Sequence, residues 1–453
     1  MIPHFLYCSI VAFVVCLMSC QPDPPTPLLK DELQEALTAQ MMHKWFPAIV
    51  DDSYGGYLSN LGKAWEVGDK QDKMIVTQAR HLWSAAQMGM RFPQDSRYQA
   101  ATKTGFEFLR DQMWDEEYGG FYNDVKQNGE VLVDEKRAYG NAFGIFGLAA
   151  YYQLSQSEEA LELAKQCFLW LDKHAHDPVH GGYYPFMDRA GTIIQVPPRG
   201  ENSRRKSAIP FKDQNPTIHL LEAFTDLYVV WPDSLLRERL VEQLFIVRDL
   251  ITHPDGYMRL YFLPNWEVVS FRDSSAEVRE ANYHLDHVTF GHDVETAYLM
   301  LEACEVLREL DCSATLSVGK KMLDHSLTWG FDQKKGGFYE RGYYFAGESA
   351  PTIIDHRKNW WAQAEGLHTL LLFSQRFPEE ESYRKAFDLQ WQYIQQYLMD
   401  PVNGGWYSHG LDTEPESAHR GKANIWKGSY HNGRALMRCL DLLHANSSRF
   451  SPH

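Results

Sequence analysis

Hydrophobic positions recur every three to four residues along most of this chain, a spacing that predicts helices. Amphipathic runs with one polar face occupy residues 31–46, 98–114, 158–174, 234–251, 314–329 and 381–399. Runs that are apolar on nearly every side follow them at residues 76–90, 139–154, 216–230, 292–310, 360–377 and 431–443. Because an amphipathic helix keeps one side in water and an apolar helix must be surrounded, the pattern predicts six outer and six inner helices.

A short glycine motif separates the two helices of each pair. It consists of one or two glycines followed by aromatic residues, and it occurs at Gly55-Gly56-Tyr57, Gly119-Gly120-Phe121, Gly181-Gly182-Tyr183, Asp255-Gly256-Tyr257, Gly336-Gly337-Phe338 and Gly404-Gly405-Trp406. Six copies in register with paired helices indicate an internal repeat. We therefore predict an all-α fold, an (α/α)6 barrel with short hairpin-like turns at one end.

The N-terminus predicts export. Residues 5–19 are apolar and are followed by Cys20 and a Pro-rich stretch. This pattern is too short for a comfortable membrane span and is typical of a bacterial lipoprotein signal, with a buried N-terminal helix as the alternative. We expect a signal peptide over 1–20, lipid on Cys20, a tether over 21–28, one barrel domain over 29–446 and a tail over 447–453. The mature protein would be a membrane-anchored lipoprotein in the periplasm or on the cell surface.

Net charge limits the classes of ligand, and the cysteines indicate whether disulfides are expected. A formal net charge of −16 without a basic cluster argues against nucleic acid, and it leaves the lipid anchor as the expected membrane contact. A neutral sugar fits the charge and the aromatic content of 13%. We expect a monomer or homodimer. The remaining cysteines are predicted to be buried thiols without metal or a disulfide framework: Cys167, Cys304, Cys312 and Cys439.

Polar residues gather at the start of every predicted inner helix. They are Arg80, Lys136, Tyr139, Asn215, His219, Glu222, His292, Glu295, Trp360, Trp361, Gln363, Glu365, Trp426, His431, Asn432 and Arg434. One polar residue in a core helix is usually a satisfied structural group. A full set at the same end of six helices predicts a shared cavity, which the extra loops at 198–213, 262–290, 343–358 and 409–425 could roof.

These side chains suit proton transfer next to a sugar carbonyl. His292 and Glu295 lie on one helical face. Two histidines at neighbouring helix starts could remove a proton from one side of a carbon and return one to the other, while Arg80 stabilises an enediolate oxygen. This chemistry, epimerisation or isomerisation, requires no cofactor.

Three other functions remain open at this point. The His219-x-x-Glu222 spacing occurs in zinc peptidases and could hold metal with a third histidine. A glycosidase built on the same barrel would need two carboxylates across a cleft, such as Glu295 with Glu222 or Glu365. A non-catalytic sugar-binding lipoprotein would need aromatic residues and hydroxyl-binding groups but no acid–base pair.

Five motifs together resemble the N-acylglucosamine 2-epimerase superfamily, most of all its cellobiose 2-epimerase branch. They are QARHLW at 78–83, NPTIHLLEAFTDLY at 215–228, FGHDVET at 290–296, KNWWAQAE at 358–365 and WKGSYHNGR at 426–434. The resemblance implies metal-free epimerisation at C2 of a reducing-end sugar, here a β-1,4-linked disaccharide of the cellobiose or mannobiose type. Activity on N-acylglucosamine and aldose–ketose isomerisation of mannose are the alternatives within the superfamily.

The resemblance also implies residue roles. His292 and His431 would be the acid–base pair, and Arg80 would contact the carbonyl oxygen. His219 and Glu295 would assist ring opening. The residues expected to bind the sugar are Tyr139, Asn215, Glu222, Trp360, Trp361, Glu365, Trp426 and Arg434. The chain departs from the branch at Asn141, where glutamine is common, and in its long loop over 262–290.

Overall fold

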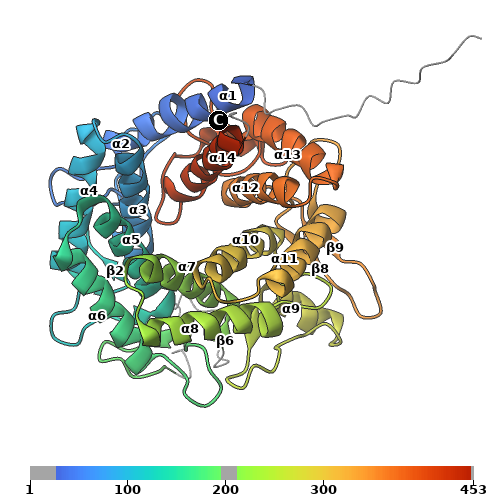
Figure 1. Ribbon diagram of the computed structural model, residues 1–453, viewed down its shortest axis with the longest axis horizontal. Coiled ribbons are helices and arrows are strands. Elements are labelled where there is room, and N and C mark those ends of the chain that lie inside the picture. The colour runs from blue at the N-terminus through green and yellow to red at the C-terminus, as the bar shows by residue number, and fades with distance from the viewer. Residues whose placement is uncertain (1–26, 195–211, 450–453) are drawn as a thin grey trace, which may run out of the picture.

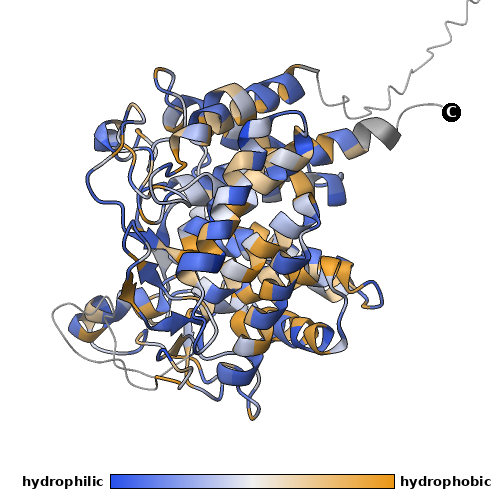
Figure 2. Cartoon of the chain, turned by 90° about the vertical axis from the view of Figure 1, so that its left-hand side faces the viewer, coloured by the Kyte–Doolittle hydropathy of each residue, from blue (hydrophilic) through white to orange (hydrophobic). Residues whose placement is uncertain are grey.

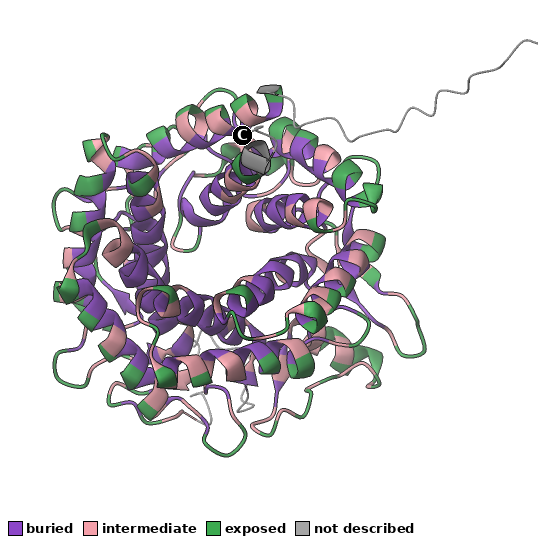
Figure 3. Ribbon diagram, viewed as in Figure 1, coloured by how far each residue is buried: buried purple, intermediate pink, exposed green. Residues whose placement is uncertain are grey.

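Two concentric rings of helices form the protein in the computed structural model, which describes residues 27–194 and 212–449 (Figure 1). The inner ring consists of α3 (Ile75–Arg91), α5 (Ala138–Ser155), α7 (Gln214–Val230), α10 (Phe290–Val306), α12 (Trp360–Arg376) and α14 (Tyr430–Arg449). These helices are buried on nearly all sides (Figure 3), because the outer ring encloses them, and their buried faces include polar side chains as well as apolar ones. The predicted all-α barrel is confirmed.

The outer ring consists of amphipathic helices whose polar faces meet water. Four of the described outer helices end in a π-helical stretch, and in the first outer helix such a stretch lies between two α-helices. The ring is formed by α1 (Pro27–Leu37), η1 (Thr38–Met42) and α2 (His43–Ala48); α4 (Ser96–Phe108) and η2 (Leu109–Met113); α6 (Glu158–His174); α8 (Ser234–Phe245) and η3 (Ile246–Ile251); α11 (Ser313–His325) and η4 (Ser326–Gly330); α13 (Glu381–Tyr393) and η5 (Ile394–Leu398). Two predicted loops contain helices: α9 (Ala276–Asp286) and the 3-10 helix η6 (Pro415–His419).

The glycine turns connect each outer helix to the next inner helix and lie at one end of the barrel, the left side of Figure 2. An antiparallel bridge flanks each turn, for example between Val50 and Tyr57 and between Met399 and Trp406. Both glycines of the five Gly-Gly pairs, and Gly256 in the remaining turn, have positive φ, which an L side chain rarely adopts. The repeated glycines are therefore a backbone requirement of the turn.

Short antiparallel strands tie neighbouring repeats together at the same end. They form the sheets β1 (Lys73–Met74), β2 (Asp124–Val125) and β3 (Val131–Val133); β4 (Lys136–Arg137) and β5 (Phe186–Met187); β6 (Lys212–Asp213) and β7 (Tyr261–Phe262); β8 (Arg341–Tyr343) and β9 (Thr352–Asp355). In the first three sheets, a strand that precedes an inner helix pairs with a strand after the next glycine turn. In these three places, the strand before an inner helix is held by a strand of the next repeat.

A buried lysine clamps five of the six glycine turns. The lysine precedes the inner helix and pairs with the aspartate that precedes the glycines, at nitrogen–oxygen distances of 2.6–3.0 Å: Lys73–Asp51, Lys136–Asp115, Lys212–Asp177, Lys358–Asp332 and Lys422–Asp400. In four of them the same ammonium also donates to the carbonyl of the first glycine. Lys136, grouped from the sequence with the cavity residues, therefore belongs to a turn.

Inner-helix side chains also bind the backbone of the glycine turns. Gln78 accepts from the Tyr57 amide at 2.8 Å, Gln363 accepts from the Phe338 amide at 2.7 Å, and Asn141 accepts from the Phe121 amide at 2.8 Å. Asn141 is thus the equivalent of these glutamines with a shorter side chain. The side chain of Asn141 bonds to the glycine turn and to Arg137 and lies against Cys167. The departure from the branch pattern at this position therefore affects the packing of a turn.

The first and last repeats meet and close the ring. Leu61 and Ala423 form an antiparallel bridge, and the Trp391 indole on α13 donates to Glu32 on α1 at 3.0 Å. Arg91 at the end of α3 forms an ion pair with Asp441 on α14. Closure brings the last inner helix beside the first, so residues more than 300 positions apart face one barrel interior.

Several predictions need correction or lie outside the described residues. Cys304 and Cys312 form a disulfide, because the turn between α10 and α11 brings them together with Cα atoms 5.9 Å apart, whereas Cys167 and Cys439 are buried free thiols as predicted. Helix α1 begins within the expected tether and α14 extends through Arg449 into the expected tail. The signal peptide and Cys20 fall outside the described residues. Within 27–194 and 212–449, no helix is long and apolar enough to cross a membrane.

Candidate active site

Polar side chains from all six inner helices meet at the end of the barrel that carries the glycine turns. This end is where every inner helix begins, so the predicted candidates lie in or near the first two turns of their helices. The structure joins six of them in one network of hydrogen bonds and ion pairs: His219, Glu222, Glu295, Glu365, His431 and Arg434. Beside this network, Arg80 and Tyr139 form a separate hydrogen-bonded pair.

Glu365 holds His431 in one orientation. The Nδ1 atom of His431 lies 2.6 Å from Glu365 Oε1, and the Tyr298 hydroxyl donates to Glu365 Oε2 at 2.7 Å. A carboxylate can only accept, so the Nδ1 atom of His431 carries the hydrogen and Nε2 keeps its lone pair. Glu365, expected to bind substrate, is thus placed to orient a base.

Arg434 is the centre of positive charge in the network. Its guanidinium forms ion pairs with Glu222, Glu295 and Glu365, the last at 2.8 Å, and all three carboxylates are buried. Removing these charges from water is unfavourable unless each is paired, which the fork of guanidinium donors allows. Arg434 therefore organises the carboxylates, and a sugar would meet groups that are already bonded to protein.

His219 is oriented in the same manner as His431. Its Nδ1 lies 2.8 Å from Glu222 Oε2, and the other oxygen of Glu222 accepts from the Tyr430 hydroxyl and from Arg434. The spacing of three residues that resembled a zinc motif serves here as a histidine–carboxylate hydrogen bond within α7. The ring of His219 also lies against Tyr139, with centroids 5.3 Å apart.

Arg80 lies on α3, the inner helix that packs between α5 and α14. It donates to the Tyr139 hydroxyl at 3.0 Å, and its guanidinium lies 4.2 Å from the centre of the Phe143 ring. Its Nε atom is buried and makes no hydrogen bond within the described part of the chain. Arg80 is thus a cation with an unused donor, which suits an oxygen that acquires negative charge.

His292 lies on the first turn of α10 against Trp361. The two ring centroids are 4.7 Å apart, and the same indole lies 5.8 Å from the His431 ring. Gly291 permits this approach, since a Cβ atom there would lie 2.7 Å from the Trp361 ring. Glu295 lies one helical turn after His292, but its carboxylate pairs with Arg434 and lies 3.9 Å from Nδ1 of His431. Its negative charge is therefore placed beside His431.

Burial and charge shift the pKa values of these groups. Burial lowers the pKa of both His292 and His431 well below the ordinary histidine value, with further lowering of the His431 pKa by Arg80 and Arg434. Burial, helped by the Glu365 carboxylate, raises the pKa of Glu295 to about 7. Before substrate binds, both imidazoles are therefore favoured in the neutral form that can accept a proton.

Three predicted sugar-binding residues stand apart from this network. Trp426 is 44% exposed, and the Trp360 ring faces the Lys427 ammonium at 5.8 Å. Asn215 lies at the start of α7, where its buried Oδ1 has no hydrogen-bond partner among the described residues. These positions are compatible with contacts to a bound sugar, but the protein network does not include them.

One cluster has the composition of a metal site. Ligand atoms of Glu295, Glu365 and His431 lie within 4.8 Å of one another. Arg434 already bonds both carboxylates, and the Nδ1 hydrogen of His431 points at Glu365. A metal ion would have to displace a guanidinium that neutralises the same charges. These side chains therefore suit the Arg434 guanidinium better than a metal ion.

Sequence reasoning missed three residues of the site. Tyr298 and Tyr430 donate to the carboxylates, and the Gln214 amide nitrogen lies 3.5 Å from Nδ1 of His292. Two of them had a detectable signal: Tyr298 lies one turn after Glu295, and Tyr430 directly precedes His431. Gln214 had no such signal, because its role depends on how α7 packs beside α10.

Comparison with known proteins places this geometry in a family. Residues 56–435 match the sequence profile of the N-acylglucosamine 2-epimerase family. The chain belongs to the N-acylglucosamine 2-epimerase family. Among its relatives in this family, a cellobiose 2-epimerase of Bacteroides fragilis is 27% identical over 417 residues, covering 92% of this chain and 99% of that protein. A cellobiose 2-epimerase of Ruminococcus albus is 27% identical over 415 residues, covering 91% and 98%.

A solved structure agrees with the family assignment. The cellobiose 2-epimerase of Spirochaeta thermophila superposes with a TM-score of 0.79 at 27% identity, covering 93% of this chain and 100% of that one. The match spans the whole barrel, so the N-acylglucosamine 2-epimerase family fold extends over both rings of helices.

Proposed function

We propose that the protein is a sugar epimerase that inverts C2 of the reducing-end sugar of a β-1,4-linked disaccharide, of the cellobiose or mannobiose type. The names of the relatives support this substrate class. The observation that carries the proposal is the pair His292 and His431, two imidazoles that lie against one indole, with the second fixed by Glu365. Two histidines at one site suit removal and return of a proton.

His431 is the base for removal of the C2 proton in one direction. After the sugar ring has opened, the lone pair on His431 Nε2 takes the proton, and Glu365 stabilises the resulting imidazolium through Nδ1. The electrons of the C–H bond form an enediolate. Arg80, with its unused Nε–H, stabilises the developing oxygen charge.

His292 returns a proton to C2 from the other side. Because His292 is neutral before substrate binds, it first takes a proton from water. It gives this proton to C2 and becomes neutral again, and His431 then returns the proton it removed to water, so the protons balance. The surroundings of His292 accept both states: Nδ1 lies 3.5 Å from the Gln214 amide nitrogen and 3.5 Å from the Thr289 hydroxyl. Gln214 Oε1 is buried and has no hydrogen-bond partner among the described residues, so an amide flip would let it accept from a protonated Nδ1.

The carboxylate geometry argues against a glycosidase. Hydrolysis requires one free carboxylic acid and one free carboxylate on either side of the scissile bond. Glu222, Glu295 and Glu365 all pair with Arg434 instead. The carboxylates therefore orient histidines and balance charge.

The substrate can be tested with a panel of reducing sugars. Purified protein is incubated in D2O with cellobiose, mannobiose, mannose and N-acetylglucosamine, and NMR follows the C2 proton and the products. We expect C2 epimers of the disaccharides. Formation of a ketose from mannose as the main product would favour aldose–ketose isomerisation, and epimerisation of N-acetylglucosamine alone would favour that substrate class. No exchange with any sugar would contradict the proposal.

We further propose that the protein is exported and anchored through lipid on Cys20. The apolar leader supports this, as does the disulfide Cys304–Cys312, because disulfides persist mainly in oxidising compartments. The test is metabolic labelling with a fatty acid in a bacterial host. Label in the membrane fraction that is lost in the Cys20→Ala variant is expected, whereas unlabelled protein in the cytoplasm would contradict the proposal.

A further inference from the structure

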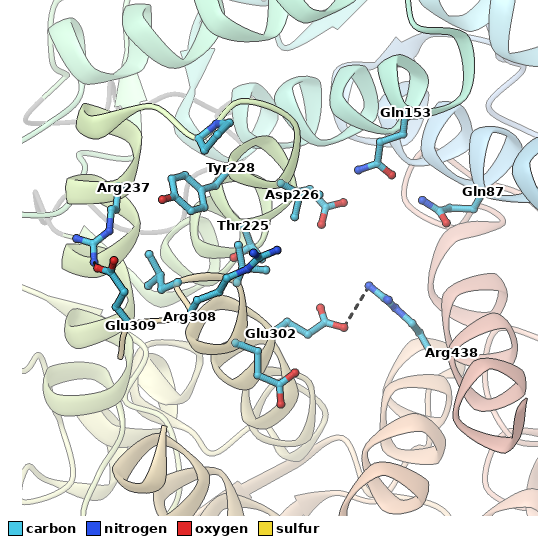
Figure 4. A pocket seen from close by; sticks show the side chains of 15 residues that line it. Gln87, Gln153, Thr225, Asp226, Tyr228, Arg237, Glu302, Arg308, Glu309 and Arg438 are labelled. Atoms are coloured by element: carbon cyan, nitrogen blue, oxygen red, sulfur yellow. Dashed lines mark hydrogen bonds and ion pairs between the residues drawn. The ribbon is translucent and has the colours of Figure 1, made fainter. Parts of the chain in front are cut away.

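A second cavity of about 780 Å³ lies at the end of the barrel opposite the histidines (Figure 4). Its walls come from the C-terminal turns of α3, α5, α7 and α10, from the first turn of α8, from the middle of α14 and from the turn that follows α10. The same helices thus carry one polar site at each end. The acid–base network lies at the end where the inner helices begin.

Five polar side chains converge on this second cavity. Figure 4 shows Gln87, Gln153, Asp226, Glu302 and Arg438 around the same open space, with Arg438 and Glu302 paired at 3.1 Å. The side chains of the two glutamines make no hydrogen bond within the described residues, although each carries a donor and an acceptor. Burial raises the pKa of the Asp226 carboxyl to about 7, so this group can either donate or accept near neutral pH.

The charges of the lining restrict the ligand. Four carboxylates (Asp226, Glu302, Glu305 and Glu309) face three guanidiniums (Arg237, Arg308 and Arg438). This near balance disfavours a phosphorylated ligand, which the carboxylates would repel, and also a free cation, which Arg438 would repel. Amides, carboxyls and a guanidinium instead match hydroxyl groups, which both donate and accept.

One wall of the cavity is covalently fixed. The disulfide Cys304–Cys312 spans the turn that carries Arg308 and Glu309, and Arg308 has a φ of +48°, a conformation that side chains seldom adopt. A cross-link restricts the movement of such a turn. The cavity is therefore formed before any ligand arrives, which lowers the entropic cost of binding.

We propose that this cavity is a second, non-catalytic binding site for a neutral mono- or disaccharide. Its volume falls in the range of small-molecule sites, roughly 300–1,000 Å³. No histidine of residues 27–194 or 212–449 lines it, so the site binds sugar without the proton transfer assigned to the other end. The proposal does not depend on which sugar the histidine site converts.

Hydrogen–deuterium exchange with mass spectrometry tests this site on the full chain. Exchange is measured with and without glucose, mannose, cellobiose or mannobiose, and with glucose 6-phosphate as the charged comparison. We expect at least one neutral sugar to slow exchange in residues 302–310 and 225–230. Absence of this protection with all neutral sugars overturns the proposal, whatever happens at the histidine end. Equal protection by the phosphorylated sugar overturns the assigned ligand class.

Variants identify the contacts. The double substitution Gln87→Leu/Gln153→Leu removes two amides that bond to no described protein group and keeps a similar side-chain size. Each lost hydrogen bond is expected to weaken binding about tenfold. Gln166→Leu, on the exposed face of α6, is the matched control and should bind as the wild type does. Undiminished protection in the double variant overturns the proposal, and exchange at the histidine end reports whether each variant remains folded.

Discussion

The hydrogen bond from His431 to Glu365 gives the sharpest quantitative prediction. Glu365 is fully buried and accepts from His431 Nδ1 at 2.6 Å and from Tyr298 at 2.7 Å. In Glu365→Gln, the amide oxygen can still accept from Nδ1 while its nitrogen donates to the Tyr298 hydroxyl. The tautomer of His431 is then preserved, and the negative charge that faces the imidazolium and the Arg434 guanidinium is lost.

The magnitude follows from the type of bond that remains. A hydrogen bond to a charged group contributes about 1.5–3 kcal/mol and a neutral one about 0.5–1.5 kcal/mol. The difference of about 1–1.5 kcal/mol corresponds to a decrease in kcat of about 5- to 10-fold. Glu365→Leu has no hydrogen-bond acceptor at this position, so the side chain no longer fixes the tautomer of His431. This variant should lower kcat by roughly 10²–10⁴-fold.

The assay is the initial rate of C2 proton exchange on the preferred sugar, with kcat and KM determined separately. Glu381→Gln, an exposed glutamate on α13, is the control and should retain the wild-type rate. Circular dichroism and thermal unfolding verify the fold of each variant. Rates within twofold of wild type for both Glu365 variants, or a greater loss in Glu365→Gln than in Glu365→Leu, would refute the assigned role of Glu365.

Three further predictions concern stability. Lys73→Met leaves the Asp51 carboxylate, 3% exposed, without its cation and should lower the free energy of unfolding by about 3–5 kcal/mol. Replacing Cys304 and Cys312 by serine opens a short loop and should cost about 2–3 kcal/mol in urea unfolding. The pKa of His431 is lowered in the folded state. The contribution of this residue to the free energy of unfolding is therefore complete above about pH 6.5 and decreases as pH falls. His431→Leu should remove about 1 kcal/mol of the stability lost between pH 6.5 and 5.5.

The lysine and disulfide predictions each have a control. Lys70→Met removes an exposed lysine that is paired with Asp72 at 3.2 Å, and it should change stability by less than about 1 kcal/mol. Reduced wild-type protein should match the double cysteine variant. A Lys73 variant as stable as the Lys70 variant, a disulfide variant as stable as the oxidised protein, or an unchanged pH dependence in the His431 variant would each contradict the corresponding argument.

Local patterns were sufficient to predict the barrel and the end that carries the site. Helix periodicity and the glycine motifs are properties of neighbouring residues, and residues in the first turns of inner helices must share one end of the ring. The lysine clamps also had a sequence signal, because a lysine precedes the inner helix in five repeats after an aspartate and glycines. Recognising it required knowing that the turn folds back onto the helix start.

The contacts within the site could not be derived from the sequence. His431 and Glu365 are 66 positions apart and lie on different helices, so their hydrogen bond depends on the rotation of α12 and α14. The same holds for Arg434, which reaches Glu222 from 212 positions away. The disulfide was missed because Cys304 lies in an apolar helix and its partner in a turn, a spacing without a recognised motif.

The central claim is that His292 and His431 exchange a proton with C2 of the sugar. It is tested most directly by NMR measurement of solvent deuterium incorporation at C2 with wild type, His292→Ala and His431→Ala. We expect incorporation with the wild type and a roughly 10²–10⁴-fold lower rate in each folded variant, which is the contribution of a positioned acid or base. Incorporation at the wild-type rate in either folded variant would contradict it.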